Sequence, residues 1–258
     1  MSSPLPATAP PGLFRPFLSP QRRCITPPLV PGEVHVWRVL LGPEGGPVDA
    51  GVLSDEERAC ADRFRRPEDR VRSLVSRAAL RELLARYVGA TPAALRFTTG
   101  PHGKPALGSG FASAAAPAFN DAHSGRLVLL AFAMFDVGID VEEVRAGVEV
   151  EDLARRFFAP EEAAALHATS QAGRVEAFFR IWTRKEAFLK AYGTGLSAPL
   201  DAFSTTTRAG KPRHEVDGQV DGAHWYLHDL APAAGYAGAV VTMEPARVVL
   251  LVLQGIPV

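Results

Sequence analysis

Three acidic residues follow an apolar run in the segment VGIDVEEV, residues 137–144. If this run is extended, Asp140 and Glu142 point to one face and Val141 to the other, because side chains alternate along a strand. Two carboxylates on one face repel each other unless a cation lies between them or one of them stays protonated. The spacing raises the possibility of a cation site at a strand end, although taken alone it favours an ordinary acidic strand end.

A second candidate group lies in the segment RVEAFFRIWTRKEAFLKAYG, residues 174–193. Its apolar spacing predicts a long helix, in which Trp182, Glu186 and Lys190 form one stripe because they are four residues apart. Lys185 lies beside that stripe. On spacing alone, Glu186 and Lys190 are most simply an exposed salt bridge, which contributes only about 0.3–0.5 kcal/mol.

The composition of the chain narrows the classes of function. Its 258 residues include 28 Lys and Arg and 28 Asp and Glu, so the net charge is zero and a polyanion-binding protein is disfavoured. Cys24 and Cys60 have no metal-ligand spacing, which indicates a reducing cytoplasmic compartment and no structural zinc. No apolar run is long enough to span a membrane.

The predicted elements that would position these residues occur in a repeated order. A strand is expected at 33–41, a long helix at 70–89 and further strands within 94–107 and 117–133. The same order follows, with a strand at 137–144, a long helix at 174–193 and strands at 224–230, 236–243 and 247–253. Ser54 with Glu57 predicts a capped helix start before the first long helix, and helical residues 151–168 precede the second.

This order predicts an α+β fold with two similar, pseudo-twofold lobes, each a long helix packed on a small, mainly antiparallel sheet. The predicted division gives a proline-rich extension at 1–31, with nine prolines and mostly disordered, then an N-terminal lobe at 32–134 and a C-terminal lobe at 135–258.

Four short motifs in a fixed order are together more specific than any of them alone. Separately, GKP at 103–105 is an ordinary turn, and the histidine of FNDAHSG at 119–125 is a structural one by default. With GIDVE at 138–142 and WTRKEAFLKAYGTGL at 182–196, they resemble the 4′-phosphopantetheinyl transferases in their two-lobed, monomeric Sfp-type form. The resemblance covers about residues 33 to 205.

The resemblance implies a reaction and its catalytic residues. Such enzymes transfer the 4′-phosphopantetheine arm of coenzyme A to a serine of an apo carrier protein and release 3′,5′-ADP. Their Mg²⁺, for which Mn²⁺ is an expected substitute, is bound by residues that correspond to Asp140, Glu142 and Glu186. Glu186 is then also the candidate general base, and Lys190 and Lys185 are expected to hold phosphate oxygens.

The resemblance also implies a set of coenzyme A contacts, namely Arg63, Arg77, Lys104 and His123. The sequence departs from the family pattern where Ala122 replaces a serine, a lost hydroxyl contact that would cost about 0.5–1.5 kcal/mol. Glu57 and Cys60 occupy positions at which some relatives have basic residues. Both departures predict weaker binding of coenzyme A, while the reaction itself is retained.

Three interpretations remain open at this point: the transferase, a Mg²⁺-dependent phosphoanhydride hydrolase, and a catalytically silent module that binds coenzyme A or a carrier. The transferase would be a cytoplasmic monomer whose partners are coenzyme A and apo acyl or peptidyl carrier domains, without nucleic acid or membrane. Polyketide or nonribosomal peptide pathways are favoured, and the carrier is expected to dock beside residues 144–170, where RRFFAPEE exposes Arg155 and Arg156.

Overall fold

The computed structural model describes residues 26–42, 49–100, 103–111, 116–193, 199–205 and 224–253. The expectation for the first 25 residues of the proline-rich extension lies outside these ranges, as does the end of the long motif at 194–196.

The first half of the described chain contains one long helix and five strands. Its elements are β1 (Glu33–Leu40), the short helix η1 (Ala50–Val52), α1 (Asp55–Ala61), α2 (Pro67–Val88), the short helix η2 (Pro92–Ala94), β2 (Phe97–Thr99), β3 (Pro105–Leu107), β4 (Ala118–Ser124) and β5 (Leu127–Ala133). The second half repeats the scheme with β6 (Val137–Glu143), α3 (Val150–Phe157), α4 (Pro160–Ala168), α5 (Gln171–Tyr192), η4 (Leu200–Ala202), β7 (Tyr226–Leu230), β8 (Tyr236–Thr242) and β9 (Arg247–Val252).

The two halves share one sheet topology. In the first, β1 pairs with β5 and β5 with β4, all antiparallel. In the second, β6 pairs with β8 and β8 with β7, again all antiparallel. In both halves the strand before the long helix therefore pairs with the last strand of the following hairpin. This equivalence confirms the predicted α+β fold with two similar lobes, although no residue-level repeat is visible in the sequence.

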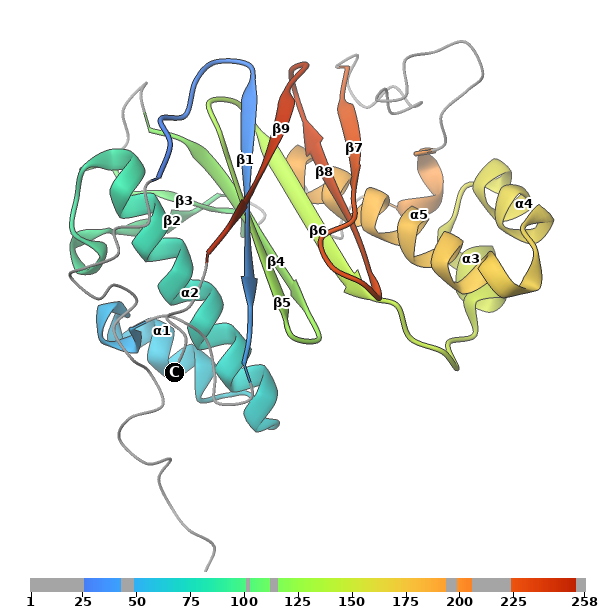
Figure 1. Cartoon of the computed structure of the whole chain (residues 1–258), viewed down its shortest axis with the longest axis horizontal. Coiled ribbons are helices and arrows are strands. Elements are labelled where there is room, and N and C mark those ends of the chain that lie inside the picture. The colour runs from blue at the N-terminus through green and yellow to red at the C-terminus, as the bar shows by residue number, and fades with distance from the viewer. Residues whose placement is uncertain are drawn as a thin grey trace, which may run out of the picture.

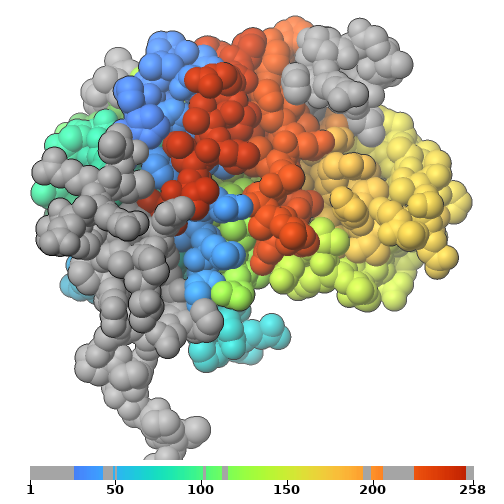
Figure 2. Space-filling model, in the orientation of Figure 1, coloured from blue at the N-terminus to red at the C-terminus, as the bar shows by residue number. Residues whose placement is uncertain are grey.

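The last strand departs from the predicted division at residue 135. β9 pairs in parallel with β1, with Val34 opposite Val248 and Trp37 opposite Leu251, and so extends the sheet of the first lobe. Figure 2 shows β9 (red) lying against β1 (blue) on the visible face. An apolar run predicts a strand but does not specify its partner, so the return of this strand to the first lobe is a property of the tertiary structure alone.

The long helices lie on the outside and the two sheets between them, as Figure 1 shows. Between the sheets, Val36 and Leu129 of the first lobe belong to one buried cluster with Ile139, Val141 and Val240 of the second. A separate cluster packs α2 on the first sheet, and another packs α5 on β7 and β8. The sheet-to-sheet contact therefore fixes how the lobes are placed relative to each other.

A glycine in β6 determines how closely α5 approaches that strand. A Cβ atom at Gly138 would lie 2.1 Å from the carbonyl oxygen of Ala187 and 2.2 Å from the amide nitrogen of Ala191. No side chain fits there, so the backbones of β6 and α5 are in direct contact. The neighbours of these alanines on α5 are Glu186 and Lys190, which this contact brings to the carboxylate end of β6.

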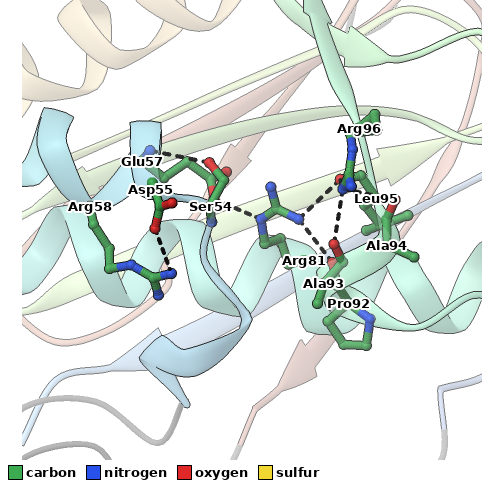
Figure 3. A network of polar contacts seen from close by, with 10 residues as sticks. All are labelled: Ser54, Asp55, Glu57, Arg58, Arg81, Pro92, Ala93, Ala94, Leu95 and Arg96. Atoms are coloured by element: carbon green, nitrogen blue, oxygen red, sulfur yellow. Dashed lines mark hydrogen bonds and ion pairs between the residues drawn. The ribbon is translucent and has the colours of Figure 1, made fainter.

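The expected helix ends are confirmed. One of them involves Glu57, which stands where some relatives have a basic residue. Ser54 and Glu57 form the predicted capping box of α1, and both long helices end at a glycine with positive φ. Glu57 also accepts a hydrogen bond from Arg81, 2.7 Å away, whose guanidinium reaches the carbonyls of Pro92 and Leu95 (Figure 3). Glu57 therefore has a structural role in this protein, because its carboxylate links α1 to α2.

Candidate functional site

An acidic residue of β6 meets a lysine of α5 within the second lobe. Asp140 is 5% exposed, and its Oδ1 lies 2.7 Å from the Nζ of Lys190. Its Oδ2 is buried without a hydrogen-bond partner in the described part of the chain. Since buried carboxylate oxygens are seldom left unpaired, this atom is available to a ligand.

Electrostatic coupling extends from this pair to Glu142 and Glu186. Burial raises the pKa of Asp140 to about 7, with Lys190 acting to lower it and the carboxylates of Glu142 and Glu186 acting to raise it. Burial also raises the pKa of Glu186, again with Glu142 contributing. Burial acts to lower the pKa of Lys190, but the surrounding carboxylates outweigh it and hold that pKa above its usual value.

The interpretation of Glu186 and Lys190 as an exposed helix pair is wrong. The ammonium group of Lys190 is bound to Asp140, fifty positions away on strand β6 of the same lobe, and Asp140 is buried. Trp182, at the other end of the expected stripe, packs against Phe157 and Phe178. Both ends of this stripe on α5 therefore contact other elements of the protein.

The oxygen atoms at this site suit a divalent cation. Among the described residues, no three His, Cys, Asp or Glu side chains converge into a preformed ligand group. Magnesium does not require such a group, because it is typically bound by one or two carboxylates together with substrate phosphates and water. The unpartnered oxygen of Asp140 and the carboxylates that act on it supply oxygen ligands of this kind, so the residues fit.

Strand β4 brings first-lobe residues to the same place. The hydroxyl of Ser124 donates to Glu142 Oε2 at 2.7 Å, and Asp121 accepts from the hydroxyl of Ser76 at 3.0 Å. Burial lowers the pKa of His123, as do Arg72 and Lys190, while Asp121 acts to raise it. The charge of Lys190 therefore acts on His123 across the boundary between the lobes.

Sequence reasoning missed Arg72, Asp121 and Ser124. The period of two in β4 could have found Asp121, which must share a face with His123. Arg72 lies on α2 and donates from its Nε to the carbonyl of Gly125, a contact between distant segments that no spacing rule predicts.

The other expected coenzyme A residues lie around the first lobe. Arg63 is exposed in the link between α1 and α2, and Arg77 is half-buried on α2. Lys104 reaches across to the second lobe, where its Nζ donates to the carbonyl of Ala191 at 3.1 Å and pairs with Asp136 at 3.3 Å. The structure therefore brings Lys104 to the end of α5 and leaves Arg63 on the surface.

Lys185 does not lie at the proposed phosphate site but is buried against α4. Its side chain is 0% exposed, with Nζ 2.6 Å from Glu162 Oε2 and 2.6 Å from each of the carbonyls of Leu200 and Phe203. An ammonium group has three hydrogens, and these three acceptors use all of them. The expectation that Lys185 holds a phosphate is corrected accordingly: its role in this structure is to tie α5 to α4 and to the segment that follows α5.

Comparison with known proteins identifies the family. The model of the 4′-phosphopantetheinyl transferase superfamily matches residues 136–241, and that of the N-terminal part of 4′-phosphopantetheinyl transferases matches residues 48–134. The 4′-phosphopantetheinyl transferase HetI of Nostoc sp. is 41% identical over 82% of this chain and 88% of its own length. This chain belongs to the 4′-phosphopantetheinyl transferases.

Other members of the family support the same assignment. A putative 4′-phosphopantetheinyl transferase of Synechocystis sp. is 38% identical over 76% of this chain and 78% of its own length. The transferase Sfp of Bacillus subtilis is 34% identical over 75% of this chain and 83% of its own length. Of the three interpretations that the sequence left open, the transferase is therefore favoured over the hydrolase and the silent module. None of the described helices of this transferase is long and apolar enough to cross a membrane.

Proposed function

We propose that this 4′-phosphopantetheinyl transferase moves the phosphopantetheine arm of coenzyme A to a serine of an apo carrier protein, using the residues between β6 and α5. The observation that carries the proposal is the ion pair of Lys190 with the buried Asp140, with Glu142 and Glu186 acting on the same carboxylate. A carboxylate that feels two further carboxylates and binds one lysine suits a reaction on a pyrophosphate.

Asp140, Glu142 and Glu186 would hold a divalent cation such as Mg²⁺, which when bound supplies Lewis-acid neutralisation of pyrophosphate charge. Glu186, whose pKa is raised by burial, accepts the proton of the carrier serine. The serine oxygen then forms a bond to the phosphorus that bears the pantetheine arm. The anhydride P–O bond breaks, and 3′,5′-ADP leaves with the electron pair. Lys190 stabilises the charge that develops on the phosphate oxygens.

The nucleotide of coenzyme A would lie along the first lobe, where His123, Lys104, Arg77 and Arg63 are the proposed phosphate contacts. Support comes from Arg63 and Arg77, whose guanidinium groups have no hydrogen-bond or ion-pair partner among the described residues. The proposed functional lobes are residues 32–134 and 135–258, and within the second range β9 (Arg247–Val252) extends the sheet of the first lobe.

Several further properties belong to this proposal. Both lobes contribute to the site, so a monomer is complete, and Mn²⁺ is expected to replace Mg²⁺. Coenzyme A and an exposed free thiol at Cys60 suit the cytoplasm. The partners are acyl or peptidyl carrier domains of polyketide or nonribosomal peptide pathways, and no nucleic acid, since the net charge is zero.

The direct test is the mass of the carrier. Incubation with coenzyme A, Mg²⁺ and each of a panel of apo acyl and peptidyl carrier domains should add one phosphopantetheine arm to at least one carrier. A variant of that carrier with alanine at its acceptor serine is the control. Consumption of coenzyme A without any mass gain on the carriers would indicate a hydrolase, and neither change would indicate a binding module.

The carrier is proposed to dock at the end of α3. Arg155 and Arg156 are exposed there, and the guanidinium carbon of Arg156 lies 5.0 Å from the ring centre of Phe157. Phe157 is half-buried and Phe158 is in the core, so only the first of the two phenylalanines contributes surface to docking. Arginines beside an apolar side chain suit the acidic helices that flank a carrier serine.

Reversal of both charges, Arg155→Glu with Arg156→Glu, should raise KM for the carrier and leave KM for coenzyme A unchanged. The reason is that the two arginines lie on α3, whereas Asp140 and Lys190 lie on β6 and α5 and the proposed nucleotide contacts lie on the first lobe. Arg180→Glu, a reversal at another exposed arginine, is the matched control and should change neither constant. Equal increases in both KM values for the double variant would argue against docking at α3.

A further inference from the structure

One hydroxyl group beside the turn between β4 and β5 contacts the second lobe at a proposed metal ligand. Ser124 Oγ accepts a hydrogen bond from the backbone amide of Glu143 at 3.1 Å and lies 2.7 Å from Glu142 Oε2. Both partners belong to β6, whereas Ser124 belongs to the sheet of the first lobe. A single side chain therefore joins the two lobes at a proposed metal ligand.

The chemistry of a hydroxyl group determines the direction of these bonds. The amide of Glu143 can only donate, so it uses a lone pair of Ser124 Oγ, and a carboxylate can only accept. The single hydroxyl hydrogen of Ser124 must then point to Glu142 Oε2. A hydrogen bond of this charge-assisted kind is short and directional, as the 2.7 Å distance shows. It fixes one carboxylate oxygen of Glu142 and so sets the direction of the other.

Contacts from both lobes hold the turn itself in place. Gly125 has a φ of +53°, and a Cβ atom there would lie 2.5 Å from the hydroxyl of Tyr236 and 2.8 Å from Glu143 Oε2. Arg72 Nε donates to the carbonyl of Gly125 at 2.8 Å. The amide of Arg126 donates to the hydroxyl of Tyr236 at 3.0 Å. Because the turn is bound by α2 and by β8, Ser124 has little freedom to move relative to Glu142.

We infer that Ser124 is a positioning residue which orients the carboxylate of Glu142 for the divalent cation, so that the first lobe tunes the metal affinity of the second. The inference rests on the proposed function. Groups that orient metal ligands typically change metal affinity by about 10- to 100-fold when they are removed. Ser124 itself touches neither the reacting phosphate nor the carrier serine in this assignment, so its loss should act through metal affinity and not through the chemical step.

The test compares Ser124→Thr with Ser124→Val, two variants of the same shape that differ in the hydroxyl group. Binding of Mn²⁺ would be measured by electron paramagnetic resonance with saturating coenzyme A and no carrier, so that no turnover occurs. We expect Ser124→Val to weaken Mn²⁺ binding by about 10-fold or more and Ser124→Thr to bind close to wild type. In turnover, Ser124→Val should need correspondingly more Mg²⁺ for half-maximal rate and should reach nearly the wild-type kcat at saturation.

Tyr236→Phe is the control for a general loosening of the turn, since it removes a hydroxyl from the same turn and keeps the bond from Ser124 to Glu142. Equal Mn²⁺ affinity in the Thr and Val variants, or an equal loss in Tyr236→Phe and Ser124→Val, would overturn the inference. If the wild-type protein binds no Mn²⁺ in the presence of coenzyme A, the proposed function fails as well. If wild type binds Mn²⁺ and Ser124→Val binds it equally well, the inference about Ser124 fails alone.

Discussion

Glu186→Gln is expected to slow phosphopantetheine transfer further than Lys190→Ala. Loss of Lys190 removes one preorganised positive charge from the phosphate, and removal of one such group typically lowers kcat by about 10²–10³. Lys190→Ala also leaves the buried Asp140 without its cation, 2.7 Å away in the native structure. Glu186→Gln keeps the shape of the side chain but removes a proposed metal ligand and the proposed base together.

A Mg²⁺ titration of the transfer rate distinguishes the two proposed roles of Glu186, as a metal ligand and as the general base. Steady-state transfer to an apo carrier would be measured for both variants from low to saturating Mg²⁺. Added Mg²⁺ should restore only part of the rate of Glu186→Gln, because metal occupancy recovers and the base does not. A return to the wild-type rate at high Mg²⁺ would show that Glu186 is a ligand only and that another group takes the serine proton. Arg180→Ala, which removes an exposed charge from the same helix, should leave the rate unchanged at every Mg²⁺ concentration.

Local spacing predicted which of these side chains share a face, but it did not show that they form a site. The period of two in β6 placed Asp140 and Glu142 on one face, and the period of four in α5 placed Glu186 and Lys190 together. What spacing could not provide is the partner of each group. The pairing of Asp140 with Lys190 depends on the close contact of β6 with α5 at Gly138, which is a property of tertiary packing.

Helix geometry alone could have corrected the prediction that Lys185 holds a phosphate oxygen beside Lys190. Lys190 lies five positions after Lys185. At 3.6 residues per turn, their side chains therefore point about 140° apart around the helix axis. Two lysines at that separation cannot both face one phosphate group. The partner of Lys185 is Glu162, on a different helix, and no sequence pattern indicates that buried pair. The same limit applies to β9, whose apolar run predicted a strand but not its place beside β1.

Glu162→Leu is expected to destabilise the fold more than Lys185→Met, although the two residues form one buried ion pair. Both side chains are 0% exposed, and their charged groups lie 2.6 Å apart. Glu162 also accepts from the amide of Ala159 at 3.0 Å, and from the amide and hydroxyl of Thr205 at 2.6 and 2.7 Å. Removal of Glu162 therefore leaves a buried ammonium and three further donors without their acceptor, whereas removal of Lys185 leaves a carboxylate that keeps three hydrogen bonds.

Removing one partner of a buried pair typically costs about 3–5 kcal/mol, and we expect Glu162→Leu to fall in that range. For Lys185→Met we expect about 1–3 kcal/mol, the cost of unpaired buried acceptors. The measurement is the free energy of unfolding in urea, with the exposed neighbour variant Glu161→Leu as a control that should change it by less than about 0.5 kcal/mol. Folded Lys185→Met should also keep the wild-type KM for coenzyme A. An unchanged stability together with a raised KM for coenzyme A would instead return Lys185 to the phosphate site, because a residue that only ties α5 to α4 must change the first quantity and not the second.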